Sequence, residues 1–414
     1  MKSNISGFHK LTLDERFKIV KEFANLNDEE VELLKKTGSL NLETANRMIE
    51  NVIGTMELPF GIATNFVINN KDYLIPMVLD EPSVVAAASY AAKLARESGG
   101  FVTSSDEPIM IGQIQLVNVN DIEKSIQKIT ENKNEIIRIA NEKDPTLLKY
   151  GDGAKDIELK MIETQRGEML LVHLLVNVRD AMGGNVVNTM AEAIAPKLEE
   201  ISGGKARLKI VSNLATKRLV RARAVWSRDV IGDDTIEGVL DAYHLALSDP
   251  YRCATHNKGI MNGIDAVALA TGNDFRAIEA GCHAYASLNG YKPLTKYEKD
   301  KKGNLVGSIE IPLAVGIVGG ATRTNPMARI ALKILGVKSS NELAEVMAAV
   351  GLAQNFAALR AIVTEGIQKG HMGLHARNIA IMAGATGDMI DKIAERMIRE
   401  GDISHERATA LLKL

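Results

Sequence analysis

The chain has 414 residues, of which 46% are hydrophobic and 25% charged, with two cysteines and a formal net charge of −2 at pH 7. This composition is that of a globular protein of two or three domains. It excludes the basic surface of nucleic-acid-binding proteins, gives no sign of a membrane-surface partner, and excludes a disulfide framework, which favours a reducing compartment. The N-terminus lacks the apolar core of a signal peptide, and no segment has about 18 uncharged apolar residues, so we expect a cytoplasmic protein.

Short helices are predicted over the first 50 residues. Thr12 with Glu15, and Asn27 with Glu30, have the spacing of a capping box before a helix, and a third helix is expected over 43–49. Residues 66–68 and 73–79 are strand-like, and the Asn69-Asn70 pair between them indicates a hairpin. An alanine-rich helix is then expected over 84–98, because Pro82 precedes it and two glycines follow it.

The pattern changes at residue 109. Strands and helices then alternate in the order β-α-β-β-α-β, which is typical of the ferredoxin-like arrangement. We therefore predict a small domain inserted into a larger one. Its elements are expected over 109–119, 121–141, 157–163, 169–178, 187–202 and 206–212.

The rest of the chain is predominantly helical after one strand, 219–226. The predicted class is α+β, with a large mixed domain (1–108 and 216–372), the inserted domain (109–215) and a small helical C-terminal unit (373–414). Helices are expected over 234–246, 262–270, 274–287, 340–350, 352–369 (ending at Gly370), 378–383, 389–399 and 405–412.

A glycine-containing turn follows the predicted strand 169–178. The chain has no G-x-G-x-x-G between a strand and a helix, so the Rossmann fingerprint is missing. Residues 180–185, DAMGGN, instead combine glycines with a helix start, where free N–H groups attract an anion. The alternative interpretation is a tight structural turn.

Polar residues interrupt the apolar region around Lys258. Lys258 stands beside Gly259 in a glycine-containing turn before a predicted helix, and Asp274 is near enough in sequence to fold back onto it. A lysine–carboxylate pair stabilises negative charge developing on oxygen and can pass a proton. From spacing alone, a structural ion pair explains the two residues equally well.

Two further residues are candidates on local grounds. Glu81 precedes the alanine-rich helix, where a carboxylate usually only caps the helix, unless another acid or a lysine converges on it. His371 follows Gly370 at a predicted helix end and titrates near neutral pH. Its alternative role is that of a cation at a helix C-terminus.

Seven motifs together resemble those of the 3-hydroxy-3-methylglutaryl-coenzyme A (HMG-CoA) reductases. The similarity extends over nearly the whole chain and is closest to the soluble class II enzymes of bacteria and archaea. The motifs occur in the family's order: ENVIGT (50–55), DEPS (80–83), DAMG (180–183), NKG (257–259), GND (272–274), VGGAT (318–322) and GHM (370–372).

The resemblance implies a role for each catalytic residue. Lys258 polarises the thioester carbonyl and later the aldehyde, and Asp274 sits beside it and tunes its charge. Glu81 is a protonated acid that supplies a proton to the mevaldehyde oxygen, a state that burial and a shared proton favour. His371 protonates the departing coenzyme A thiolate, next to a C-terminal helical tail that acts as a mobile flap.

The implied reaction interconverts HMG-CoA and mevalonate by two successive hydride transfers, through mevaldyl-CoA and mevaldehyde. Coenzyme A is part of substrate and product. Arg252 pairs with the free carboxylate of the substrate, while Ser83 and Asn262 contact its HMG portion. The direction of the reaction in the cell remains open, since mevalonate degradation uses the same site as mevalonate synthesis.

The resemblance also makes the inserted domain a non-Rossmann dinucleotide-binding domain. A carboxylate accepts hydrogen bonds from a free ribose 2′-OH and repels a 2′-phosphate, so Asp144 favours NADH over the alternative, NADPH. The turn residues that hold the dinucleotide are Asp180, Met182, Gly183 and Asn185.

The expected assembly is a homodimer with shared active sites, and beyond it a trimer of dimers; neither nucleic acid, nor membrane, nor metal is expected. Two other function classes predict different site residues. An inactive CoA- or nucleotide-binding homologue predicts loss of at least one of the four catalytic residues, yet all four are present. A metal-dependent hydrolase built on His371 and His375 lacks a clear third ligand.

Overall fold

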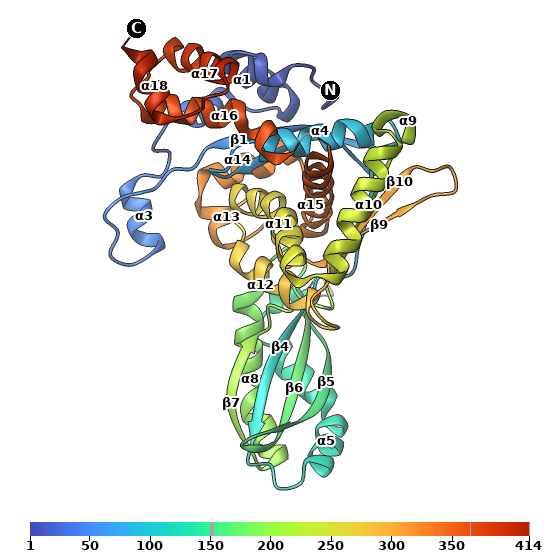
Figure 1. Ribbon diagram of the computed structural model, residues 1–414. Helices are drawn as coiled ribbons and strands as arrows, with labels where there is room; N and C mark the ends of the chain where they lie inside the picture. Colours follow the sequence, from blue (N-terminus) through green and yellow to red (C-terminus); the bar gives the residue numbers. More distant parts are fainter. Residues whose placement is uncertain (150–152, 365, 414) are drawn as a thin grey trace.

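The computed structural model describes residues 1–149, 153–364 and 366–413, without the side chains of residues 367–374. The chain forms two β-sheets with helices packed on them (Figure 1), so the predicted α+β class is confirmed. The large part contains a six-stranded sheet in the order β2-β1-β3-β8-β10-β9. The part that projects downward in the view contains a four-stranded sheet in the order β5-β6-β4-β7.

The N-terminal helices begin as predicted. Thr12 and Asn27 accept hydrogen bonds from the N–H groups of Glu15 and Glu30, whose carboxylates bond back to the cap N–H groups. This reciprocal bonding satisfies N–H groups that the first helical turn leaves open. The elements are η1 (Phe8–Lys10), α1 (Leu13–Ala24), α2 (Asp28–Lys35) and α3 (Leu42–Met48).

The predicted hairpin forms the edge of the large sheet. Asn69 and Asn70 both have positive φ, 47° and 64°, which a two-residue turn of this twist requires and asparagine tolerates. The alanine-rich helix α4 packs on β1, because its small side chains allow a close approach. The elements are β1 (Phe60–Ile68), β2 (Lys71–Val78), α4 (Val84–Arg96) and β3 (Phe101–Ser105).

The segment that carries the four-stranded sheet has the predicted β-α-β-β-α-β order, and all neighbouring strands of that sheet are antiparallel. The predicted helix 121–141 is instead two helices. The side chain of Asn132 donates to the carbonyl oxygen of Lys128 and thereby competes with the helical backbone bonds. The elements are β4 (Ile109–Val117), α5 (Ile122–Glu131), α6 (Lys133–Asn141), α7 (Pro145–Lys149), β5 (Gly153–Thr164), β6 (Gly167–Asn177), α8 (Gly184–Ser202) and β7 (Lys205–Val211).

The chain then returns to the large sheet. Strands β9 and β10, which form a hairpin at its edge, have no counterpart in the prediction. The elements are β8 (Leu219–Trp226), α9 (Arg228–Ile231), α10 (Asp233–Ser248), α11 (Pro250–Ala270), α12 (Phe275–Ala286), β9 (Thr295–Lys299), β10 (Leu305–Pro312), α13 (Gly320–Thr324), α14 (Pro326–Leu335) and α15 (Ser340–Val363).

Helix α11 runs unbroken through the segment predicted as a turn, so that prediction is wrong. Asp249 caps the helix by accepting a hydrogen bond from the N–H of Arg252, and Pro250 occupies the first helical position. A Cβ on Gly263 would lie 3.0 Å from side-chain atoms of α15. This glycine therefore permits the close crossing of α11 and α15.

Helix α15 is a single helix where two were predicted. A Cβ on Gly351 would lie 2.8 Å from the side chain of Ile264, so this glycine permits close packing and does not end the helix. By length and composition α15 is apolar enough to cross a membrane, the one such helix in the described part of the chain. However, 72% of its apolar stretch is buried inside the protein, as is usual for a core helix.

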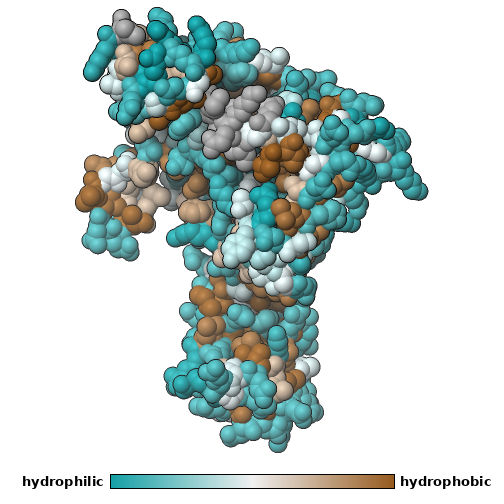
Figure 2. Space-filling model, viewed as in Figure 1, coloured by the Kyte–Doolittle hydropathy of each residue, from teal (hydrophilic) through white to brown (hydrophobic). Residues whose placement is uncertain are grey.

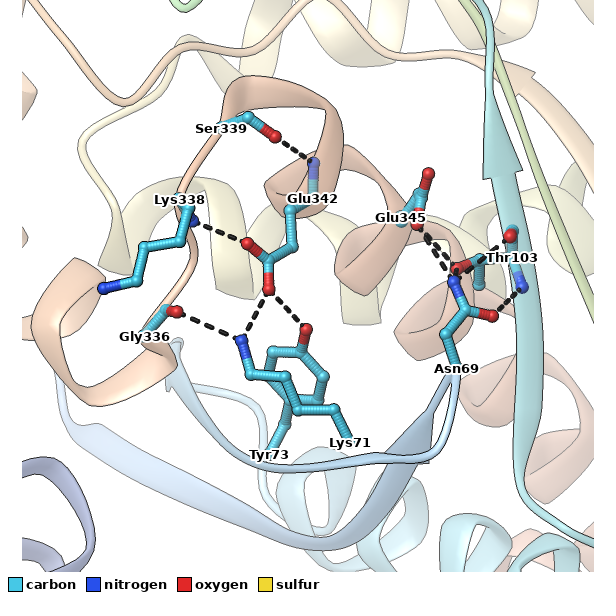
Figure 3. A network of polar contacts seen from close by, with 9 residues as sticks. All are labelled: Asn69, Lys71, Tyr73, Thr103, Gly336, Lys338, Ser339, Glu342 and Glu345. Carbon is cyan, nitrogen blue, oxygen red and sulfur yellow. Dashed lines mark hydrogen bonds and ion pairs between the residues drawn. The ribbon is translucent and has the colours of Figure 1, made fainter.

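Two carboxylates hold the start of α15 against the β1–β2 hairpin and β3 (Figure 3). Glu342 accepts hydrogen bonds from Lys71 Nζ (2.6 Å), Tyr73 Oη (2.7 Å) and the N–H of Lys338 (2.6 Å). Burial alone would raise the pKa of Glu342, but these bonds outweigh it and hold the pKa below its ordinary value. One turn on, Glu345 accepts hydrogen bonds from Asn69, Thr103 and Ser105.

The C-terminal tail has its own small core. Helix α16 begins before Gly370 and continues past it, so the predicted helix end at Gly370 is wrong. The tail helices pack together through Ala376, Ile393, Met397 and Leu411. The elements are α16 (Ile367–Met382), α17 (Asp388–Glu400) and α18 (His405–Leu412).

Candidate active site

The structure brings Lys258 and Glu81 together. Lys258 Nζ on α11 lies 2.9 Å from Glu81 Oε2 in the loop between β2 and α4, and the two side chains are 60% and 44% exposed. An ion pair this exposed contributes little to folding stability. Stability therefore does not explain the pair, whereas a site that must admit a ligand does.

Asn262 joins this pair from the next turn of the same helix. Its Nδ2 donates to the same Glu81 oxygen at 3.3 Å, because residues four apart lie on one helix face. A cation and a neutral amide thus converge on one carboxylate oxygen. A ligand oxygen at this place meets two hydrogen-bond donors, Lys258 and Asn262, with the carboxyl group of Glu81 beside them.

Ser83 follows Glu81 in a strained backbone conformation. It has φ 74° and ψ −16°, in the left-handed region that non-glycine residues avoid, and its hydroxyl is buried without a hydrogen-bond partner among the described atoms. A strained residue with an unsatisfied polar group needs an explanation beyond packing. A ligand contact at this loop provides one.

Asp274 has other partners than the predicted one. Its Oδ1 accepts hydrogen bonds from the N–H groups of Arg276 and Ala277 at the start of α12, and from Arg276 Nε at 3.0 Å. Burial would raise the pKa of Asp274, but these bonds and the nearby guanidinium lower it. In the described part of the chain no hydrogen bond joins Asp274 to Lys258, so the contact between them stays a prediction.

Arg252 lies in the first turn of α11, half-buried. Its backbone N–H bonds to Asp249, while its guanidinium has no ion-pair partner among the described residues. Burial lowers the pKa of Arg252. A half-buried guanidinium that lacks a protein carboxylate is suited to bind one from a ligand.

His371 lies outside the described side chains. Its backbone belongs to α16, and its predicted role stays a prediction.

The glycine turn before α8 is shaped for close backbone approach. Gly183 has φ 99°, and a Cβ there would lie 2.5 Å from the side chain of Val178. No side chain among the described residues caps the helix start, so its first N–H groups are open to an anion. Asn185 is exposed and Met182 half-buried beside this turn.

Asp180 and Asp144 have structural contacts of their own. Asp180 Oδ1 accepts a hydrogen bond from the N–H of Ser340 at the start of α15 (2.9 Å). Asp144 Oδ1 accepts from the N–H groups of Thr146 and Leu147, which caps α7. Each carboxylate is thereby fixed in position, and each contact occupies one of its oxygens.

Two residues near the site were missed by sequence reasoning. Arg218 is 2% exposed and bonds to the turn before α8. Asn273 bonds to both the N–H and the carbonyl oxygen of Gly316, at 2.8 and 3.1 Å. Only its position between Gly272 and Asp274 in the GND motif pointed to Asn273, and no local pattern marked Arg218.

Comparisons with known proteins show the family of the chain. The profile of the family described as hydroxymethylglutaryl-coenzyme A reductase matches residues 12–376. The 3-hydroxy-3-methylglutaryl-coenzyme A reductase of Archaeoglobus fulgidus is 61% identical over 414 residues, covering 100% of this chain and 95% of that protein. A probable 3-hydroxy-3-methylglutaryl-coenzyme A reductase of Borreliella burgdorferi is 35% identical, covering 96% and 93%.

Solved structures from Streptococcus pneumoniae are similar in fold as well. A 3-hydroxy-3-methylglutaryl-coenzyme A reductase from this organism has a TM-score of 0.85 and 40% identity, covering 99% of both chains. A class II enzyme from the same organism, bound to NADPH in open conformations, has a TM-score of 0.83 and 40% identity, covering 97% of this chain and 99% of that one.

Proposed function

The chain belongs to the HMG-CoA reductase family, and from this premise we propose how its residues divide the work of the reaction. The chain is an oxidoreductase that interconverts HMG-CoA and mevalonate with a nicotinamide cofactor. The observation that carries the assignment of residues is the convergence of Lys258 and Asn262 on Glu81.

Lys258 is the group that stabilises negative charge on the reacting carbonyl oxygen. Its ammonium is exposed to a ligand and already bonds to a carboxylate oxygen at 2.9 Å, which shows the reach that an oxyanion requires. Glu81 supplies the proton to the mevaldehyde oxygen. Its contact with Lys258 supports this division, because proton donor and oxyanion partner must meet the same oxygen.

Asp274 and His371 complete the proposed catalytic set. Asp274 tunes the charge of Lys258. This role requires the Asp274 carboxylate to release Arg276 and to bind Lys258 instead. His371 protonates the coenzyme A thiolate as it leaves. Arg252, Ser83 and Asn262 bind the HMG portion, which the free guanidinium and the unsatisfied Ser83 hydroxyl support.

The dinucleotide belongs to the turn at α8. The missing Cβ at Gly183 and the uncapped helix start fit a phosphate group, and Asp180, Met182 and Asn185 complete the turn. When bound, the cofactor supplies the hydrides. A class II relative binds NADPH; our preference for NADH in this chain depends on Asp144, whose fixed negative charge disfavours a 2′-phosphate.

The division of labour among parts of the chain follows. Residues 1–108 and 216–372 bind HMG-CoA and form the subunit contact, residues 109–215 bind the dinucleotide, and residues 373–414 form a flap. A flap that opens has a use here, because the cofactor must be exchanged between the two hydride transfers. We place the enzyme in the cytoplasm.

We further propose a homodimer with shared active sites, assembled into a trimer of dimers. A projecting arm, defined as residues 42–58, exposes apolar side chains (Figure 2), among them Ile53 at 100% and Met56 at 91%. Apolar exposure of this kind marks a contact surface. The exposure of the Lys258 and Glu81 side chains also supports a dimer, because the site needs a second subunit that covers it and excludes water.

A direct assay tests the proposal. Purified protein is mixed with HMG-CoA and NADH or NADPH, and absorbance of the reduced cofactor is followed. We expect about two cofactors oxidised per HMG-CoA, one for each hydride transfer, with NADH preferred. The reverse assay, with mevalonate, coenzyme A and NAD⁺, addresses the degradative direction. Absence of turnover in both directions would leave the inactive homologue as the better interpretation.

A further inference from the structure

Arg218 is a buried charge at the junction of the two sheets. In the sequence it falls between β7 of the small sheet and β8 of the large sheet, and it is 2% exposed. Its Nη1 donates to the carbonyl oxygen of Ala181 (3.2 Å), and its Nη2 donates to the carbonyl oxygen of Val315 (2.6 Å) and to Ser340 Oγ (2.9 Å). One guanidinium therefore ties together three segments from both parts of the molecule.

The surroundings of Arg218 compensate its charge only in part. Burial lowers the pKa of Arg218 to about 10, with nearby Asp180 opposing the shift, so it remains a cation at neutral pH. Its Nε has no hydrogen-bond partner among the described atoms. An apolar side chain of similar volume often gives equal stability at such a place, so a role in positioning accounts better for an arginine.

The turn that Arg218 holds is pressed against the large part of the molecule. A Cβ on Gly316 would lie 2.6 Å from the backbone nitrogen of Met182. The N–H of Ile317 donates to the carbonyl oxygen of Asp180 at 2.9 Å. The turn and the 313–317 loop are thus in direct backbone contact.

The same loop leads to the catalytic side. Asn273 holds Gly316 by two hydrogen bonds, and it is the neighbour of Asp274 at the start of α12. A continuous set of short contacts therefore runs from the turn before α8, through Gly316, to Asp274. Rigid contacts of this kind fix the geometry of two parts that act on one substrate.

We propose that Arg218 is a positioning residue that fixes the dinucleotide-binding turn, residues 180–183, against the substrate-binding part of the chain. Its guanidinium acts through hydrogen bonds to protein atoms. This inference rests on the proposed role of the turn in holding the dinucleotide. Loss of the guanidinium frees the turn, so dinucleotide binding weakens while the HMG-CoA contacts on α11 remain.

The test compares Arg218→Lys with Arg221→Lys. Arg221 lies three residues on, is 40% exposed, and pairs with Asp106 and Glu310, so it controls for loss of an arginine at the same junction. NADH and NADPH binding is measured by cofactor fluorescence without HMG-CoA, and kcat and KM by the assay above. For Arg218→Lys we expect a dissociation constant of the dinucleotide raised at least about tenfold, a lower kcat, and a KM for HMG-CoA within about twofold of wild type.

Equal dinucleotide affinity in Arg218→Lys and wild type would overturn the inference, as would an equal loss of affinity for both ligands in a folded Arg218→Lys protein, since the guanidinium then does not act on the dinucleotide-binding turn in particular. Gly316→Ala provides a second route if Arg218→Lys fails to fold. The added methyl displaces the same turn and leaves the guanidinium intact, so it must also weaken dinucleotide binding selectively. A wild-type protein that binds neither NADH nor NADPH contradicts the proposed function and this inference together, whereas a normal wild type with unaffected variants contradicts the inference alone.

Discussion

Lys258 and Glu81 are 177 residues apart in the sequence, and their side chains meet at 2.9 Å. The lysine comes from the middle of α11 and the glutamate from a loop that ends in the strained residue Ser83. Exposed ion pairs contribute about 0–1 kcal/mol to stability, so removal of this pair tests chemistry and hardly tests folding.

Lys258→Ala should therefore separate activity from stability. We expect kcat to fall at least about 100-fold, because a donor to the developing oxyanion is lost, while the melting temperature changes little. The measurement is reduced-cofactor oxidation with HMG-CoA, alongside thermal unfolding. Lys296→Ala is the control, since Lys296 is 64% exposed and also paired, with Glu298 at 2.7 Å. Substantial turnover in Lys258→Ala would contradict the assigned role.

Asp144→Ala should narrow the preference for NADH. Without the carboxylate, a ribose 2′-OH loses an acceptor and a 2′-phosphate is no longer repelled, so the kcat/KM ratio of NADH to NADPH should move towards one. Glu142→Ala is the control, because Glu142 is a surface carboxylate, 57% exposed, that like Asp144 precedes α7 in the sequence. An unchanged ratio in Asp144→Ala means that this residue only caps α7.

Glu342→Gln should reduce stability in a pH-dependent way. The pKa of Glu342 is lowered in the folded protein, so its contribution is present above the unfolded value of about 4.3 and is lost as the pH falls through the lower, folded value. We expect a loss of about 1–3 kcal/mol in the free energy of unfolding at pH 7, as for a hydrogen bond to a charged group. Below about pH 4 the difference from wild type should shrink.

Urea unfolding across this pH range measures the effect. Glu32→Gln is the control, because the side chain of Glu32 is 71% exposed. A constant difference between Glu342→Gln and wild type at every pH would show that the charge of Glu342 does not stabilise the contact between α15 and the hairpin.

Ile53→Asp should weaken subunit association. Ile53 is fully exposed in the single chain, so a charge there costs nothing in the monomer but is buried in the proposed dimer. Light scattering after size exclusion should show a smaller species, with activity lost because the sites are shared. Leu13→Asp, at another exposed apolar side chain (66%), should leave the assembly unchanged. An Ile53→Asp protein with the mass of wild type would place the interface elsewhere.

Much of the fold was predictable from local signals. Both capping boxes, the Asn69-Asn70 hairpin and the β-α-β-β-α-β order are present in the structure. Each depends on side chains that act on their own backbone or on a regular hydrophobic period. Such signals need no knowledge of distant residues.

Two of the errors concern glycines. Gly259 suggested a turn and Gly351 a helix end, yet both lie inside long helices. Gly263 and Gly351 lie where α11 and α15 cross closely, and only packing between helices reveals this use. A glycine that lowers local helix propensity can be favoured by tertiary contact.

By itself the sequence determined which residues are candidates, because Glu81, Lys258, Asp274 and His371 stand in motifs whose order identifies the family. It also determined the local elements that carry them. Only the tertiary structure decided that Lys258 and Asn262 share one face of a continuous helix and converge on Glu81, and that buried Arg218 joins the two sheets. The reason is physical: local bonding sets the elements, whereas contacts between distant residues depend on how the elements pack.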